Sequence, residues 1–292
     1  MATSQIKDCQ LCFIGGGNMG AAIIGGLLAK GSTSQQNVIV SEPWEVNRKK
    51  VEESLGVRTT TSNIEAARDA NVLVLAVKPQ VAKGVCQELA ASWSDSNRQQ
   101  LPLVVSIAGG ITLNALTQWF TVNDGRTPRV VRVMPNTPAL LGEGASASFA
   151  GAGVSEDEKK LVTELLEGFS KVTEWVDREE LIDVVTGLSG SGPAYFFLLV
   201  EHMVSSATAL GLPKEQAQRL ATQTCLGAGR MLVETSESPA QLRINVTSPK
   251  GTTEAALKSF AESGLQETVN VAIKAAVDRA EELGNAAFAS TG

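Results

Sequence analysis

Histidine is almost absent from this sequence: among 292 residues the only one is His202. A Ser-His-Asp triad and a metal site built from several histidines are therefore nearly excluded. Only four cysteines occur. Cys9 and Cys12 have CxxC spacing, but Cys12 lies within the first apolar run, where a core thiol is expected rather than a redox or metal site. The residue types thus predict a protein without a bound metal.

Clusters of basic residues are also lacking. The formal net charge is −6 and the pI is near 5.1, so nucleic acid is not an expected partner. The segment from Met1 to Lys7 is polar and lacks the apolar core of a signal peptide. Pro193–Leu212 is about as long as a membrane span, but Glu201 and His202 lie at its centre. We expect a helix buried in protein, no membrane contact and a cytoplasmic location.

Apolar residues are plentiful, at 43% of the chain, and short apolar runs alternate with helical patterns in its first part. Continuous apolar runs are typical of parallel strands that are covered on both faces. The alternation predicts a doubly wound α/β domain. The expected strands are Leu11–Ile14, Val38–Val40, Val72–Val77, Leu103–Ile107, Val130–Val133 and Val172–Val176.

Beyond Arg178 the pattern becomes helical, which predicts a dinucleotide-binding domain at residues 1–178 and an all-α domain at 179–292. Apolar residues nearly encircle the helix that contains Leu198, Leu199 and Met203. A helix that is apolar all round must be buried, and so small a domain offers little room for it. We therefore expect subunits to interlock through this domain as an obligate dimer or a larger ring. The expected helices are Glu180–Leu188, Pro193–Leu212, Pro213–Glu234 and Thr252–Phe288, the last with a break near Gly264.

A glycine loop follows the first strand and opens the first helix. Its glycines, Gly15, Gly17 and Gly20, have GxGxxG spacing, which places the pyrophosphate of a dinucleotide on a helix N-terminus. Glu42 ends the second strand, where an acidic residue would bind the ribose 2′-hydroxyl of NAD. Arg48 and the lysines after it would instead suit a 2′-phosphate, so these residues leave the choice between NADH and NADPH open.

Other strand ends and two loops of the helical part offer further polar groups. Lys78 follows one strand and could face either cofactor or solvent, and the prolines around Asn136 make a stiff loop that can present polar groups. Ser189–Pro193 and Thr247–Thr253 each place small residues before a helix, which suits a carboxylate or phosphate as well as ordinary capping. No usual general base is visible. Hydride transfer to a protonated C=N bond needs none, which favours an imine substrate over a ketone.

Together these segments resemble pyrroline-5-carboxylate reductase, and they follow one another in family order over nearly the whole chain. The first segment is shared by many dehydrogenases, whereas the last two are specific to the family. They are Phe13–Gly20, Ala76–Gln80, Arg132–Pro138, Gly187–Tyr195 and Val246–Thr253.

The resemblance implies reduction of the small-molecule substrate 1-pyrroline-5-carboxylate to L-proline by NADPH or NADH, the last step of proline biosynthesis. It implies a Rossmann domain, a helical domain through which a homodimer interlocks, and a decamer of five dimers. Cofactor and substrate loop would then come from different subunits. The implied cofactor-binding residues are Ile14, Gly15, Gly16, Gly17, Asn18, Met19, Asn63, Ala76, Val77, Lys78, Pro79, Ile107, Ala108 and Gly109, to which the position of Glu42 adds a further candidate.

The same resemblance assigns the substrate site to the last loop. Gly251, Thr252 and Thr253 would hold the substrate carboxylate together with Ser248, and Thr253 would be the catalytic hydroxyl beside the ring nitrogen. Glu237 matches an acidic residue near the site, and Asn63 matches a residue near the 2′-phosphate, which favours NADPH. The chain departs from the family pattern at two positions, Lys250 in place of a second glycine and Ile244 in place of an acidic residue. Both differences bear on substrate affinity and not on the fold.

Two other functions fit parts of the pattern. A related imine or β-hydroxyacid reductase would share the two-domain frame, but β-hydroxyacid enzymes use a lysine in the helical domain, and Lys214 at the start of a helix is expected to be exposed. A dinucleotide sensor without turnover would not need the second anion-binding loop at Thr247–Thr253.

Overall fold

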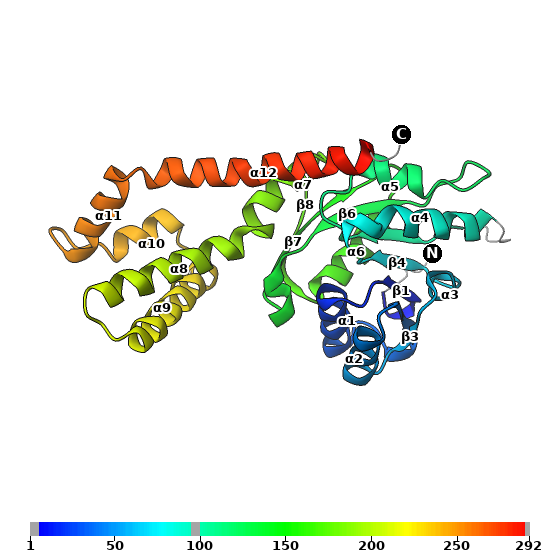
Figure 1. Ribbon diagram of the computed structural model, residues 1–292, viewed down its shortest axis with the longest axis horizontal. Coiled ribbons are helices and arrows are strands. Elements are labelled where there is room, and N and C mark those ends of the chain that lie inside the picture. Colours follow the sequence, from blue (N-terminus) through cyan, green and yellow to red (C-terminus); the bar gives the residue numbers. More distant parts are fainter. Residues whose placement is uncertain (1–5, 95–99, 290–292) are drawn as a thin grey trace. The chain divides into compact units, whose positions relative to one another are not determined.

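The computed structural model describes residues 6–94 and 100–289. The expectation that no signal peptide is present rests partly on Met1 to Gln5, and these residues lie outside the described ones. Contacts divide the chain into two compact units (Figure 1). The first unit joins Met1–Gly190 with Ala276–Gly292, and the second is Ser191–Ala275.

One eight-stranded sheet forms the centre of the first unit, in the order β3-β2-β1-β4-β5-β6-β7-β8. The first six strands are parallel, β7 is antiparallel to β6, and β8 is parallel to β7. This is the doubly wound order, with its switch point between β1 and β4. The strands are β1 (Leu11–Ile14), β2 (Val38–Ser41), β3 (Arg58–Thr60), β4 (Val72–Leu75), β5 (Leu103–Ser106), β6 (Val130–Met134), β7 (Gly144–Ala150) and β8 (Ser170–Trp175).

Side chains that alternate along each strand build two separate cores. Leu11 and Phe13 of β1 belong to one core, and Cys12 and Ile14 belong to the other. The first core contains α1 (Asn18–Lys30), α2 (Glu45–Leu55) and α6 (Glu156–Glu167). The second contains α3 (Asn63–Ala67), α4 (Pro79–Ser94) and α5 (Leu113–Trp119). Because both faces of the sheet are covered at its centre, β1 and β4 are apolar and buried throughout.

Helices make up the second unit, in which α8 (Gly192–Ala209) packs against α9 (Lys214–Glu234). Next come α10 (Pro239–Asn245), α11 (Thr252–Glu262) and α12 (Leu265–Ala289), whose last turns belong to the first unit. There, Leu283 and Gly284 lie against Gly110 after β5. Three short elements, η1 (Ile6–Asp8), η2 (Gln35–Asn37) and η3 (Thr137–Leu141), and the helix α7 (Leu181–Val185) complete the fold.

The α/β fold class with a helical C-terminal part is confirmed, and each of the six predicted strands is present. The sequence did not predict β3, β7 or α10. β7 consists almost entirely of glycine, alanine and serine, which have little strand preference, and it forms because β6 and β8 pair with it on both sides. The predicted boundary after residue 178 stays a prediction.

The helix α8 is not buried within the single chain, although its apolar pattern predicts burial. Phe196, Phe197 and Leu198 are 58%, 70% and 53% exposed. The helical segment Leu181–Ala209 is long and apolar enough to cross a membrane by length and composition, and only 17% of its most apolar window is buried. The predicted interlocking of subunits would cover this surface.

Candidate functional site

The carboxyl ends of four neighbouring strands lie in register at one edge of the sheet. Ile14 of β1 pairs with Ser41 of β2 and with Leu75 of β4, and Leu75 pairs with Ser106 of β5. The backbone continues this alignment, because Gly15 donates to the carbonyl of Ser41 at 2.8 Å. Ligands of such sheets bind at this edge, beside the switch point. The predicted cofactor residues of all four strands therefore follow one continuous edge.

Three glycines of the loop after β1 lack a side chain for different structural reasons. Gly15 has φ +105°, and a Cβ there would lie 2.5 Å from the carbonyl oxygen of Ala76. A Cβ on Gly20 would lie 2.7 Å from the carbonyl oxygen of Gly15, so helix and loop pack closely there. No described heavy atom lies within 4 Å of a Cβ built on Gly17, the residue that caps α1. The backbone at Gly17 is therefore open to a ligand, and the loop fits a pyrophosphate.

Glu42 is 5% exposed and its carboxylate lies beneath the glycine loop. Its Oε2 accepts a hydrogen bond from the backbone N–H of Gly16 at 2.9 Å, and its Oε1 accepts one from the N–H of Trp44 at 3.0 Å. Both oxygens therefore bind backbone groups of the protein. This bracing role was not predicted, because a sequence does not show which backbone groups a buried carboxylate meets.

Asn63 begins α3 and lies next to the end of β2. Its Oδ1 accepts a hydrogen bond from the hydroxyl of Ser41 at 2.7 Å, and its Nδ2 donates to Glu88 at 2.8 Å. Its amide is thus oriented by one neighbour on β2 and one on α4. The predicted contact of Asn63 with a 2′-phosphate is compatible with this position.

The remaining predicted cofactor residues lie directly after β4 and β5. Ala76 donates from its N–H to the carbonyl of Ile14 at 2.9 Å, and Ile107 donates to that of Leu75 at 3.1 Å. Val77 is half-buried, while Lys78 is exposed and Pro79 is the first residue of α4. Ala108 is buried and Gly109 half-buried. With Ile14, Asn18 and Met19 at the glycine loop, all of them belong to this edge of the sheet.

The stiff loop at Asn136 does not present its amide to a ligand. Its Nδ2 donates to the carbonyl of Ser189 at 3.1 Å, and its Oδ1 accepts from the N–H of Ala145 at 2.9 Å. The small residues of Ser189–Pro193 do lead into α8, which begins at Gly192, but Ser189 and Gly190 are themselves helical. Thr186–Gly190 is a π-helical turn, so the chain stays helical from α7 into α8. Sequence periodicity does not reveal such a turn, which is frequent at functional sites.

The second predicted anion loop does precede a helix. Gly251 caps α11 in an extended conformation, and since glycine has no side chain, the cap supplies no acceptor for the first N–H groups. Thr253 is half-buried, and Thr252 and Ser248 are exposed. Lys250 has φ +60°, the described non-glycine residue with a left-handed backbone. Its N–H donates to Glu254 at 2.6 Å, which holds the loop in this shape.

Glu237 is connected to the same region through Asn245. The Nδ2 of Asn245 donates to Glu237 at 2.8 Å, and its Oδ1 accepts from Gln241 at 2.8 Å. Asn245 ends α10, two residues before Thr247, so this network sets the start of the loop. Ile244 is 57% exposed and leaves the network without a second carboxylate at that position.

A cluster of charges joins the buried Arg132 of β6 to two partly buried carboxylates, one just before α7 and one within it. The guanidinium of Arg132 is 2.5 Å from Glu179 and 3.7 Å from Asp183. Glu179 also accepts from the N–H of Leu113 at 2.7 Å. Burial raises the pKa of Asp183, which the positive charge of Arg132 only partly offsets. An arginine within an apolar strand is the sequence signal that could have revealed this cluster.

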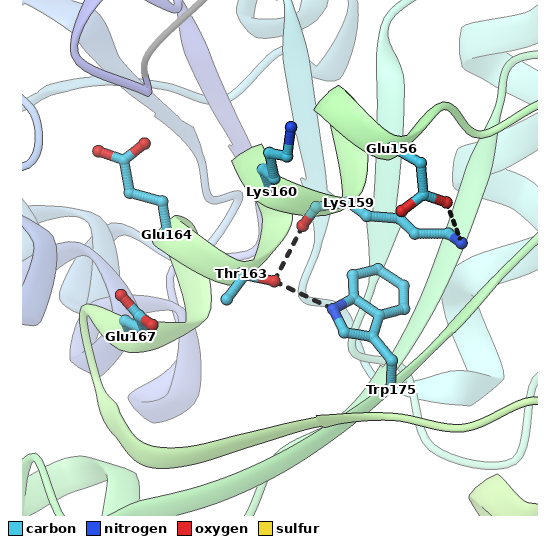
Figure 2. Close-up of a pocket in the computed structure, with 7 residues that line it drawn as sticks. All are labelled: Glu156, Lys159, Lys160, Thr163, Glu164, Glu167 and Trp175. Atoms are coloured by element: carbon cyan, nitrogen blue, oxygen red, sulfur yellow. Dashed lines mark hydrogen bonds and ion pairs between the residues drawn. The ribbon is translucent and has the colours of Figure 1, made fainter. Parts of the chain in front are cut away.

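A shallow hollow between α6 and β8 lies outside the predicted site (Figure 2). Trp175 donates from Nε1 to the hydroxyl of Thr163 at 3.0 Å, and Thr163 donates to the carbonyl of Lys159 at 2.9 Å. Lys159 also pairs with Glu156 at 2.7 Å. These polar groups bind one another along the wall, and the strand that borders the hollow, β8, is the edge strand of the sheet.

Two family models match the chain. Residues 10–110 match a model described as NADP oxidoreductase, coenzyme F420-dependent. Residues 179–283 match the model of pyrroline-5-carboxylate reductase dimerisation. The second match contains α8, so the exposed apolar residues of that helix lie within a dimerisation region.

Relatives of known classification match over nearly the full length. A pyrroline-5-carboxylate reductase from Pseudomonas aeruginosa is 45% identical over 94% of this chain and 96% of its own. The Arabidopsis thaliana protein of the same name is 38% identical, over 95% and 96%. The solved structure of the Coxiella burnetii enzyme has a TM-score of 0.86 at 41% identity, over 94% and 98%.

A fourth relative was solved together with a dinucleotide. The Plasmodium falciparum pyrroline carboxylate reductase with NADP bound has a TM-score of 0.80 at 28% identity, and the match covers 95% of this chain and 99% of that one. Similarity to pyrroline-5-carboxylate reductases in sequence and in fold thus extends over both parts of the chain. The chain belongs to the pyrroline-5-carboxylate reductase family, whose members are NAD(P)H-dependent oxidoreductases.

Proposed function

We propose that this protein reduces 1-pyrroline-5-carboxylate to L-proline with NADPH. The observation that carries the proposal is the open backbone at Gly17, at the edge of the sheet where four strand ends meet, in a chain 45% identical to a pyrroline-5-carboxylate reductase. The bound dinucleotide of the Plasmodium falciparum relative supports NADPH, and NADH is the alternative. The reaction completes proline biosynthesis, and we assign it to the cytoplasm.

The cofactor is held along the carboxyl edge of the sheet. N–H groups at the start of α1 bind its pyrophosphate, and Asn63 and Glu42 lie at its adenosine end. The segments after β4 and β5 line its nicotinamide half. The proposed contacts are those of Ile14, Gly15, Gly16, Gly17, Asn18, Met19, Ala76, Val77, Lys78, Pro79, Ile107, Ala108 and Gly109.

The substrate carboxylate is held at the start of α11. The N–H groups of Thr252 and Thr253 lie in the first turn of a helix that has no side-chain cap, where the helix dipole favours an anion. Gly251, whose own N–H donates to the carbonyl of Ser248 at 3.0 Å, adds no side chain that would cover this helix end. Ser248 adds a hydroxyl, and Glu237 orients the preceding segment through Asn245. A carboxylate bound in this way fixes the orientation of the small ring beside it.

The chemistry requires little from the side chains. The reduced nicotinamide supplies a hydride to the ring carbon of the C=N bond, and the protonated ring nitrogen accepts the electron pair of the π bond to become a secondary amine. The hydroxyl of Thr253 steadies that nitrogen through a hydrogen bond. The protein needs no general base for this step, which agrees with the single histidine lying exposed on α8.

The matched dimerisation model supports a homodimer. We further propose that five dimers form a decamer, and that the functional domains are residues 1–178 and 179–292. The two family matches lie on either side of this proposed boundary.

A substrate panel tests the function. Purified protein is supplied with NADPH or NADH and with pyrroline-5-carboxylate, with 1-pyrroline, which lacks the carboxylate, or with a β-hydroxyacid and oxidised cofactor. We expect pyrroline-5-carboxylate to be preferred over 1-pyrroline and the β-hydroxyacid to be inert, since Lys214 is exposed at the start of α9. Turnover of the β-hydroxyacid alone would assign the chain another activity. Cofactor binding without any turnover would make it a sensor.

A further inference from the structure

Trp44 is an exposed aromatic residue close to the glycine loop. It follows the end of β2, caps the N-terminus of α2 and is 75% exposed. In contrast, Trp93 and Trp119 are 3% and 4% exposed, and Trp175 lies in the hollow beside Thr163. Aromatic rings usually bury most of their surface. Since this exposed indole lies at the ligand-binding edge of the sheet, we looked for a ligand group on which it could pack.

A single carboxylate ties Trp44 to the glycine loop. Glu42 accepts the N–H of Gly16 on one oxygen at 2.9 Å and the N–H of Trp44 on the other at 3.0 Å. Glu42 is itself fixed, because its own N–H donates to the carbonyl of Thr60 on β3 at 3.0 Å. The backbone of Trp44 is therefore held at a set place relative to the loop that would bind the pyrophosphate.

Arg48 lies one helical turn after Trp44, and its Nη1 donates to the carbonyl of Glu42 at 3.2 Å. This bond uses one of the five N–H donors of the guanidinium. Arg48 is half-buried, whereas the side chain of Lys49 is 64% exposed and paired with Glu45 at 2.7 Å. Lys49 and Lys50 line a different face of α2. In the structure Arg48 therefore differs from the two lysines in burial and in its face of α2, a difference that the sequence alone does not show.

We propose that Trp44 and Arg48 form the adenosine-recognition element of the dinucleotide site, an inference that rests on the proposed function. The indole stacks on the adenine ring, and the guanidinium binds the 2′-phosphate. A purine offers a flat π-face to an aromatic side chain, and the guanidinium fork matches phosphate oxygens. Since both oxygens of Glu42 bind backbone N–H groups, its charge is partly compensated beside an incoming phosphate.

Calorimetric titration of the full-length protein with NADPH, NADH and adenosine 2′,5′-bisphosphate tests the assignment without an activity readout. We expect Trp44→Ala to weaken binding of all three by about tenfold, and Trp44→Phe to restore most of it. Arg48→Ala should weaken NADPH and the bisphosphate by about tenfold and change NADH by less than about twofold. The matched controls Val46→Ala and Lys49→Ala, exposed positions on the same helix, should change none of them.

The outcomes separate the two proposals. A wild-type protein that binds neither dinucleotide overturns the proposed function and this inference with it. A wild-type protein that binds NADPH while Trp44→Ala and Arg48→Ala bind equally well overturns the inference alone. An equal loss for Arg48→Ala and Lys49→Ala would show general charge attraction and would also overturn it. Thermal unfolding checks that each variant is folded, and the Trp44 variants should match the wild type because that side chain is exposed.

Discussion

The carboxylate of Glu42 accepts a hydrogen bond from the backbone N–H of Gly16, with 2.9 Å between Oε2 and nitrogen. The sequence position of Glu42 suggests a ligand for the ribose of NAD. In the structure its two oxygens accept hydrogen bonds from Gly16 and Trp44, so the residue shapes the glycine loop, and the ribose contact stays a prediction.

The first prediction concerns this bracing role. In Glu42→Ala, two backbone N–H groups lose a buried acceptor, so we expect the free energy of unfolding to fall by about 1–3 kcal/mol. Affinities for NADPH and NADH should fall together, because the loop serves both. Urea denaturation and calorimetric titration measure the two effects. A selective loss of NADH affinity with unchanged stability would instead assign Glu42 to the ribose hydroxyls.

The second prediction concerns Lys250, whose φ of +60° is costly for a residue with a side chain. We expect Lys250→Gly to raise the free energy of unfolding by about 0.5–1 kcal/mol, measured by urea denaturation. Lys250→Ala, which keeps the strain but lacks the ammonium group, is the control. An equal rise in the substrate KM of both variants would show that the positive charge assists the carboxylate, and an unchanged stability of Lys250→Gly would contradict the strain.

Much of this fold follows from local patterns. The apolar runs located six of the eight strands of the sheet. The capping box that begins α6 is also local, because Ser155 and Glu158 are three residues apart and both of its reciprocal hydrogen bonds form. The glycine loop could be located because Gly15 and Gly20 meet steric requirements of the backbone and because its GxGxxG spacing is local in sequence.

Other features depend on contacts that no local pattern records. β7 is made of small residues and is defined by its two neighbouring strands, and the π-helical turn at Thr186–Gly190 leaves the helical pattern intact. Glu42 binds the backbone N–H of Gly16, 26 residues away, and Asn136 binds the carbonyl of Ser189, 53 residues away. Their roles therefore became visible only in three dimensions.

The third prediction concerns pH. Burial is the main reason that the pKa of Asp183 lies above its usual 3.8. The folded protein thus binds this proton more tightly than the unfolded chain, so ionisation of Asp183 lowers stability. This penalty is absent below pH 3.8, grows as the pH rises toward the folded-state pKa, and is constant above it.

Asp183→Asn should remove this part of the pH dependence. The stability of the variant relative to wild type should therefore improve as the pH rises from 3.8 and then level off. Urea denaturation over a series of pH values measures the difference. Asp177→Asn, at a side chain that is 84% exposed, is the matched control and should give a flat difference. A flat difference for Asp183→Asn as well would contradict the prediction.

The fourth prediction concerns the apolar surface of α8. Phe197 is 70% exposed in the single chain, and a change at a solvated position usually alters stability by less than about 0.5 kcal/mol. If subunits cover it, Phe197→Glu should shift the protein from dimer toward monomer in sedimentation equilibrium. Leu141→Glu, at a residue of η3 that is 83% exposed, is the control and should not. Dimers that persist in Phe197→Glu would place the interface elsewhere.

The most direct test of the proposed reaction measures NADPH oxidation and L-proline formation in the same sample. With pyrroline-5-carboxylate, the wild type should form one L-proline for each NADPH oxidised, with no oxidation when the substrate is omitted. Thr253→Ala should lower kcat by about tenfold if its hydroxyl contributes one hydrogen bond in the transition state. An absence of turnover with both NADPH and NADH would contradict the account.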